Sequence, residues 1–170
     1  ISASLVGSEM CIRDSVMYIA TGDDDAGDSY SVGIWKSVDG GDSWNPTGIN
    51  PSNSPSSIYE IEMHSLNPEI IWAATNGGLY KTVDGGQNWN QTQNGAFQGV
   101  KQKPNNANIV YAITASEFYK STNGGDSFSL SGTGLYSESA RLVLDVTPAN
   151  ENLVYIVAST SNYSFEGVYR

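Results

Sequence analysis

The sequence predicts an all-β fold built from repeated antiparallel strands. Three observations support this prediction. The composition is rich in turn and strand formers, with 18 Gly, 10 Tyr and 4 Trp in 170 residues. Short apolar or alternating runs are separated by Gly, Pro and Asn turns, and no run has the period of an amphipathic helix. An octapeptide also recurs along the chain, which indicates a repeat architecture.

The octapeptide follows the pattern Ser/Thr-x-Asp-x-Gly-x-x-Trp. It occurs at residues 37–44, 82–89 and 121–128, and the third copy carries Asn and Phe in place of Asp and Trp. An Asp or Asn side chain at such a turn accepts hydrogen bonds from nearby backbone N–H groups, and glycine adopts positive φ without a steric cost. Because Asn keeps the turn but not a carboxylate, the pattern predicts a structural role. The predicted structural residues are Ser37, Asp39, Gly41, Trp44, Thr82, Asp84, Gly86, Trp89, Ser121, Asn123, Gly125 and Phe128.

The segments around each octapeptide also repeat. Each unit contains an alternating strand A, a Pro/Asn turn, an apolar strand B, a loop, a strand C that ends in Lys or Arg, the octapeptide turn, and a strand D. Four antiparallel strands in about 40–45 residues are typical of a β-propeller blade. The prediction is therefore a β-propeller fragment of about three and a half four-stranded antiparallel blades, at approximately residues 16–50, 57–97, 98–135 and 140–170.

These repeats resemble the Asp-box (bacterial neuraminidase, BNR) repeat. Residues 16–170 as a whole are most similar to sortilin-like and YVTN/BNR-like Asp-box propellers of secreted bacterial proteins. The resemblance implies a secreted or cell-surface location. It implies little about activity, because propellers of this kind serve hydrolases, receptors and assembly factors.

Both ends of the sequence depart from the repeat. Residues 4–15 read like a translated sequencing-adapter segment, so residues 1–15 are set aside from functional reasoning; the alternative is a divergent first strand. The last unit stops where another octapeptide is expected to begin. A closed propeller needs more blades than these, so we expect the rest of the propeller to be missing from the chain.

Composition excludes several classes of function. The net charge is −10 and the eight basic residues are scattered, which argues against a nucleic-acid partner. No apolar stretch is long enough for a membrane span. Cys11 is the single cysteine and His64 the single histidine, so neither a disulfide within the chain nor a Ser/His/Asp arrangement is supported.

The B–C loops differ in length between the blades, and long loops on a rigid rim often carry binding residues. The first loop contains Asp23, Asp25 and Asp28, which either hold a hard cation such as Ca²⁺ or form a solvated acidic loop. Tyr30 in this loop, and Tyr163 and Phe165 in the last, are candidates for stacking on sugar rings.

These features favour a non-catalytic binding or scaffold module that contacts a polysaccharide or a protein through the B–C rim. The alternative is a fragment of a glycoside hydrolase that resembles the Asp-box, xyloglucan-active enzymes, with Asp23 as a catalytic carboxylate and its partner carboxylate absent. Only three arginines are present, so the arginine cluster implied by sialidase resemblance is missing. The cations Lys36, Lys81, Lys120 and Arg170 recur once per blade, either as a surface ladder or as sites for an anion.

Overall fold

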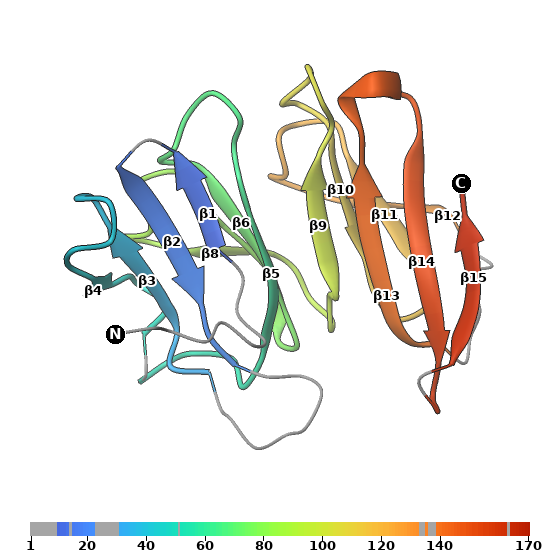
Figure 1. The fold of residues 1–170 in the computed structure, drawn as a ribbon, viewed down its shortest axis with the longest axis horizontal. Coiled ribbons are helices and arrows are strands. Elements are labelled where there is room, and N and C mark those ends of the chain that lie inside the picture. The colour runs from blue at the N-terminus through green and yellow to red at the C-terminus, as the bar shows by residue number, and fades with distance from the viewer. Residues whose placement is uncertain are drawn as a thin grey trace.

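The computed structural model describes residues 10–13, 15–22, 31–50, 52–132, 135, 139–162 and 164–170. It contains four antiparallel sheets, which follow one another from the N-terminal to the C-terminal end of the molecule (Figure 1). Each sheet is called a blade, and within each blade the strands are ordered as they occur in the chain. The predicted all-β fold with sequential antiparallel units is therefore confirmed.

The first blade contains β1 (Met10–Arg13), β2 (Val16–Ala20), β3 (Ile34–Ser37) and β4 (Asn45–Pro46). The second contains β5 (Ile58–Met63), β6 (Ile71–Thr75), β7 (Gly78–Thr82) and β8 (Asn90–Gln93). The third contains β9 (Gly99–Gln102), β10 (Val110–Ile113), β11 (Phe118–Ser121) and β12 (Ser129–Gly132). The fourth contains β13 (Ser139–Val146), β14 (Val154–Thr160) and β15 (Phe165–Tyr169).

The first strand of the chain was not expected from the repeat pattern. Met10–Arg13 form β1, and this strand pairs with β2 over Met10↔Ile19 to Arg13↔Val16. Both alternatives for residues 1–15 stay predictions. Residues 1–9 lie outside the described part of the chain.

Register explains why the same residue types recur in each blade. The strand B aromatic is paired with the strand C cation in three blades, as Tyr18↔Lys36, Trp72↔Lys81 and Tyr111↔Lys120. The cation of strand C therefore lies at the same place in these three blades, because it pairs with the aromatic residue of strand B in each of them. In the fourth blade the turn between strands A and B is a short 3₁₀ helix, η1 (Pro148–Asn150), where the Thr147 hydroxyl accepts a hydrogen bond from the Ala149 N–H.

The hydrophobic core lies between blades. Three clusters of buried residues each combine one face of a blade with the opposite face of the next blade. Strands β1, β5, β9 and β13 lie side by side through the molecule (Figure 1), so strand A is the inner strand of every blade. Strand B is buried on both faces in the second and third blades, because a blade covers each side of it.

Antiparallel pairing places the loops on two rims. The A–B turns and the octapeptides between strands C and D are on one rim, which we call the box rim. The B–C loops and the D–A connections are on the opposite rim, which we call the B–C rim. In Figure 1, η1 on the box rim and the turn between β14 and β15 on the B–C rim lie at opposite edges of the molecule.

Candidate functional site

The octapeptides, called box turns here, form closed networks of hydrogen bonds. In the first, the Ser37 hydroxyl donates to Asp39 Oδ1 at 2.8 Å and accepts from the Gly41 N–H at 2.8 Å. Asp39 also accepts from the Ser43 N–H and hydroxyl, at 2.9 and 2.5 Å. The hydrogen bonds from Ser43, with the one from Ser37, lower the pKa of Asp39 to about 2.

The other two box turns repeat this geometry. Asp84 accepts from the Asn88 N–H at 2.9 Å and from the Asn88 amide at 2.8 Å, which lowers its pKa to about 2. Asn123 replaces the carboxylate in the third turn, where its Oδ1 accepts from Ser121 and Ser127 while its amide donates to the Ser127 hydroxyl at 3.0 Å. The hydrogen bonds made by Asp39 and Asp84 lie within their own turns, as a structural role requires.

The strand B aromatic and the strand C cation connect each blade to the box rim of the next. Trp72 is fully buried and its Nε1–H donates to the Gly124 carbonyl in the third box turn at 3.1 Å. Lys81 lies over the Trp72 ring and pairs with Asp126 at 2.6 Å. At the first junction, Tyr18 donates to the Pro68 carbonyl at 3.2 Å, and Lys36 pairs with Glu69 at 3.4 Å.

These contacts decide between the two interpretations of the cation ladder at two of its four positions. Lys36 and Lys81 each pair with a carboxylate of the following blade, so they are structural residues and not free anion sites. Burial lowers the pKa of Lys36, but Tyr18 and Glu69 outweigh this effect and raise it overall. Lys36 also lines a cavity of about 410 Å³ at the first junction. Lys120 and Arg170 line a cavity of about 410 Å³ between the third and fourth blades.

That cavity corresponds to a place where earlier junctions hold a box turn. Its other lining residues are largely aromatic or aliphatic: Tyr111, Phe118, Leu135, Val154, Ile156 and Tyr169, with Ser131, Gly132 and Asn152. At the second junction the third box turn lies against Trp72 and Lys81.

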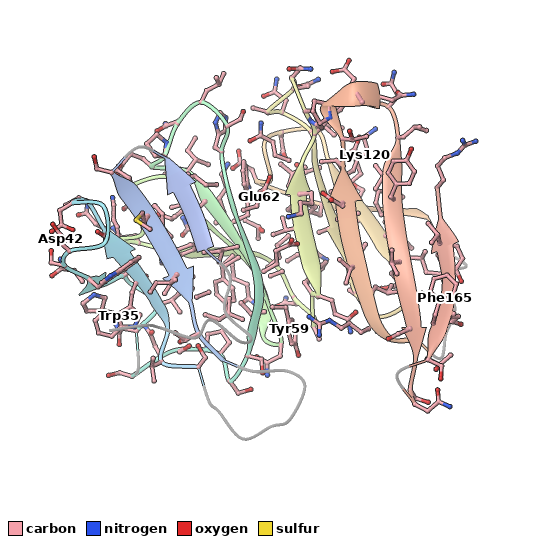
Figure 2. The ribbon with its side chains drawn as sticks, viewed as in Figure 1. Trp35, Asp42, Tyr59, Glu62, Lys120 and Phe165 are labelled. Atoms are coloured by element: carbon pink, nitrogen blue, oxygen red, sulfur yellow. The ribbon has the colours of Figure 1, made fainter. Side chains whose placement is uncertain are left out.

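An acidic cluster on the inner strands was missed in the sequence. Glu60 and Glu62 of β5 accept hydrogen bonds from the N–H groups of Val100 and Gln102 in β9, at 2.7 and 3.2 Å. Lys101 lies between them, at 2.6 Å from Glu60 and 3.8 Å from Glu62. Glu62 lies near the centre of the molecule in Figure 2. The available signal was Glu-x-Glu in a strand otherwise made of apolar residues.

Burial shifts the pKa values of the carboxylates in this cluster. Desolvation raises the pKa of Glu60 to about 7, even though Lys101 and the Val100 N–H favour its charged form. Desolvation likewise raises the pKa of Glu62. The two carboxylates, with Asp145 in β13, raise the pKa of Lys101 above its ordinary value despite burial. A shifted carboxyl pKa can indicate a catalytic acid. Here both Glu60 oxygens have partners within the fold, which indicates that the residue caps the inner edge of the third blade.

The B–C rim is described only in part. Asp23, Asp25, Asp28, Tyr30 and Tyr163 lie outside the described residues, so their arrangement stays a prediction. Phe165 begins β15 and is 73% exposed (Figure 2). Among the described residues, no group of three or more His, Cys, Asp or Glu side chains is placed to hold a metal ion. In the same part of the chain, no helix is long and apolar enough to cross a membrane.

The base of the first B–C loop is held firmly. The Thr21 hydroxyl donates to the Gly33 carbonyl at 3.0 Å and accepts from the Val32 N–H at 2.9 Å, which joins the two ends of the loop. The Ser31 N–H donates to the Ser56 carbonyl at 3.0 Å, so the loop end is also fixed to the connection between the first and second blades.

Comparison with solved structures identifies the architecture. An ancestral GH74 enzyme matches with a TM-score of 0.67 and 22% identity, over 88% of this chain and 22% of that one. The GH74 enzyme of Niastella koreensis matches with a TM-score of 0.61 and 16% identity, over 94% and 29%. YCF48 bound to D1 peptide matches with a TM-score of 0.55 and 17% identity, over 94% and 51%.

The fold is a β-propeller fragment. The identities are low, so the likeness concerns the fold alone. The chain spans between about a fifth and a half of the length of these neighbours. No protein-family model matches the sequence, and no curated protein matches it.

Proposed function

We propose that this chain is part of a non-catalytic binding or scaffold propeller, which contacts a polysaccharide or a protein through the B–C rim. The observation that carries the proposal is that the acidic groups of the box turns and of β5 are occupied by partners within the fold. The box-turn carboxylates, Glu60 and Glu62 bind their own turns or the next blade. The B–C rim, in contrast, presents the exposed ring of Phe165, and the sequence predicts an acidic loop there.

The neighbours support both ligand classes. One neighbour is YCF48 bound to D1 peptide, and two others are GH74 enzymes. The proposal extends to a sortilin-like, Asp-box family membership and to a secreted or cell-surface bacterial location, both of which rest on the octapeptide resemblance.

The test compares ligand binding by variants on opposite rims. Native gel electrophoresis in soluble polysaccharides such as xyloglucan, and binding to a peptide array, measure the two ligand classes. Phe165→Ala and Tyr163→Ala are expected to weaken binding about tenfold each, since stacking of one ring contributes roughly 1 kcal/mol or more. Leu66→Ala is the matched control, because Leu66 is 77% exposed on the box rim.

Equal effects of Phe165→Ala and Leu66→Ala would remove the B–C rim from the proposal. Binding of neither ligand class by the folded chain would overturn it entirely.

A hydrolase fragment is the second candidate, and the similarity to GH74 enzymes favours it. In this alternative Asp23 is one of two catalytic carboxylates, and the other belongs to a part of the enzyme outside this chain. Release of reducing sugar from xyloglucan by the full-length gene product, abolished in Asp23→Asn with unchanged folding, would establish it. An active Asp23→Asn enzyme would exclude Asp23 from catalysis.

A further inference from the structure

The chain contains three Asn-Gly pairs, at residues 76–77, 94–95 and 123–124. In such a pair the backbone nitrogen of the glycine can attack the amide carbon of the asparagine, because glycine has no side chain to hinder the approach. The reaction needs an asparagine side chain that can turn toward the backbone and a glycine N–H that has no other partner. The three asparagines are all exposed, so solvent access does not distinguish them.

Hydrogen bonds hold the first pair. The Asn76 side chain accepts from the Ser57 N–H at 3.2 Å and donates to the Ser56 hydroxyl at 2.5 Å. The Gly77 N–H donates to the Thr75 hydroxyl at 3.1 Å. Both groups that would have to react are therefore occupied.

The third pair belongs to the third box turn and is held in the same way. Asn123 Oδ1 accepts from the Ser121 hydroxyl and the Ser127 N–H, and its amide donates to the Ser127 hydroxyl at 3.0 Å. The Gly124 N–H donates to the Asn108 carbonyl at 2.8 Å. Reaction at this pair would require the box turn to open first.

The second pair lacks these restraints. Asn94 and Gly95 lie between the end of β8 and Phe97, which is fully buried and whose N–H donates to the Thr75 carbonyl at 2.9 Å. Within the part of the chain that the structure describes, neither the Asn94 side chain nor the Gly95 N–H makes a hydrogen bond. A Cβ atom at Gly95 would meet only the Phe97 ring, at 3.7 Å, so the pair has room to rearrange.

We propose that Asn94 is a site of spontaneous deamidation and that Asn76 and Asn123 are protected from it. The Gly95 nitrogen bonds to the side-chain carbon of Asn94, the bond from that carbon to its amide nitrogen breaks, and ammonia leaves with the proton of the Gly95 N–H. Water then opens the resulting cyclic imide at either carbonyl, which leaves an aspartate or an isoaspartate at position 94. No oxidant or reductant takes part.

The product changes the rim to which ligand contact is assigned. The connection between β8 and β9 lies on the B–C rim, so each reacted chain carries an added negative charge there. The isoaspartate product also lengthens the backbone by one carbon between β8 and Phe97. The modification does not depend on the proposed function, because it needs only water.

Incubation of the folded chain in heavy-oxygen water at mildly alkaline pH tests the proposal. Oxygen from this water enters only the asparagines that react during incubation, which separates them from any reaction during later digestion. Trypsin cleavage after Lys and Arg places the three pairs in different peptides, residues 37–81, 82–101 and 121–141. Mass spectrometry is expected to show conversion at Asn94, located by fragmentation, at least about tenfold faster than at the other two pairs.

Two variants test the chemistry and the protection. Gly95→Ala hinders the attacking nitrogen and is expected to slow conversion at Asn94 at least about tenfold. Thr75→Val removes the acceptor of the Gly77 N–H and is expected to raise the rate at Asn76 severalfold. Circular dichroism checks that both variants fold.

Unfolding the wild type in urea separates the effect of the fold from that of the sequence. All three pairs are then expected to react at similar rates, because each has the same Asn-Gly sequence. Equal rates in the folded chain would overturn the proposal, as would an unreactive Asn94. The same order of rates in urea as in the folded chain would also overturn it, because the hydrogen bonds would then have no part in the protection.

Discussion

Gly125→Ala tests whether the box turns bind blades together. Gly125 has φ of +81°, and a Cβ atom there would lie 2.2 Å from Trp72 Nε1. The indole must therefore move and lose its 3.1 Å hydrogen bond to Gly124. A lost buried hydrogen bond costs about 1–3 kcal/mol, and forced repacking of the core costs a similar amount. Left-handed backbone adds about 1 kcal/mol for an alanine.

Gly124→Ala separates these contributions. Gly124 has φ of +69°, so its alanine carries the same backbone cost, but the nearest atoms to its Cβ are 3.7 and 3.8 Å away. We expect Gly125→Ala to lower the free energy of unfolding by about 3 kcal/mol more than Gly124→Ala, or roughly 6–12 °C in melting temperature. Urea unfolding followed by circular dichroism measures both.

A further variant identifies the indole as the cause. Combining Gly125→Ala with Trp72→Phe removes the Nε1 group that the methyl meets, so the two changes are expected to cost less together than the sum of their separate costs. Equal destabilisation by Gly124→Ala and Gly125→Ala, within about 0.5 kcal/mol, would refute the interlocking of the second and third blades through Trp72.

Three further predictions concern titration and ions. Because burial raises the folded-state pKa of Glu60 from 4.5 to about 7, its stabilising contribution is complete below about pH 4.5 and is lost as the pH rises to 7. The free energy of unfolding of the wild type, relative to that of Glu60→Gln, should fall over this interval by at most about 3 kcal/mol. A constant difference between the two proteins would contradict the raised pKa. The folded-state pKa of Asp84 is lowered from 3.8 to about 2, so the stability that its carboxylate contributes is lost as the pH falls from 3.8 to 2. Asp84→Asn should remove this loss of stability in acid. Asn123→Asp should introduce a similar loss at the third box turn. Calorimetric titration with CaCl₂ distinguishes the two interpretations of Asp23, Asp25 and Asp28: we expect dilution heats only, as for a solvated acidic loop, and binding heat that Asp25→Asn abolishes would establish a cation site instead.

Much of the fold follows from local patterns that repeat. The box turns require glycine at positive φ, as Gly85 and Gly86 show with φ of +68° and +89°. Strand B had to be apolar on both faces because a blade covers each side of it. The repeated aromatic and cation predicted a common position, and the register Trp72↔Lys81 supplies it. These features are local, so a single sequence reveals them.

Other features depend on contacts between blades and were not visible in the sequence. The free N–H groups of β9 receive their acceptors from Glu60 and Glu62, about 40 residues earlier in the chain. Similarly, the Leu142 N–H donates to Gln98 at 2.8 Å. Strand β1 lacks the repeat pattern, yet it pairs with β2 over four residues, because backbone hydrogen bonding needs no particular side chains.

The position of the interlocking contacts also limits where a ligand can bind. On the box rim, a strand B aromatic and a strand C cation bind the A–B turn of the next blade at the first junction and its box turn at the second. A ligand there would have to displace contacts that hold the blades together. Cavities of about 410 Å³ lie beside the strand C cation at the first junction, next to Lys36, and at the third, next to Lys120. The B–C rim carries no such ladder in its described part; there, Thr21 and Ser31 hold the two ends of the first B–C loop. Binding on this rim therefore leaves the junctions intact, which is why we assign ligand contact to it.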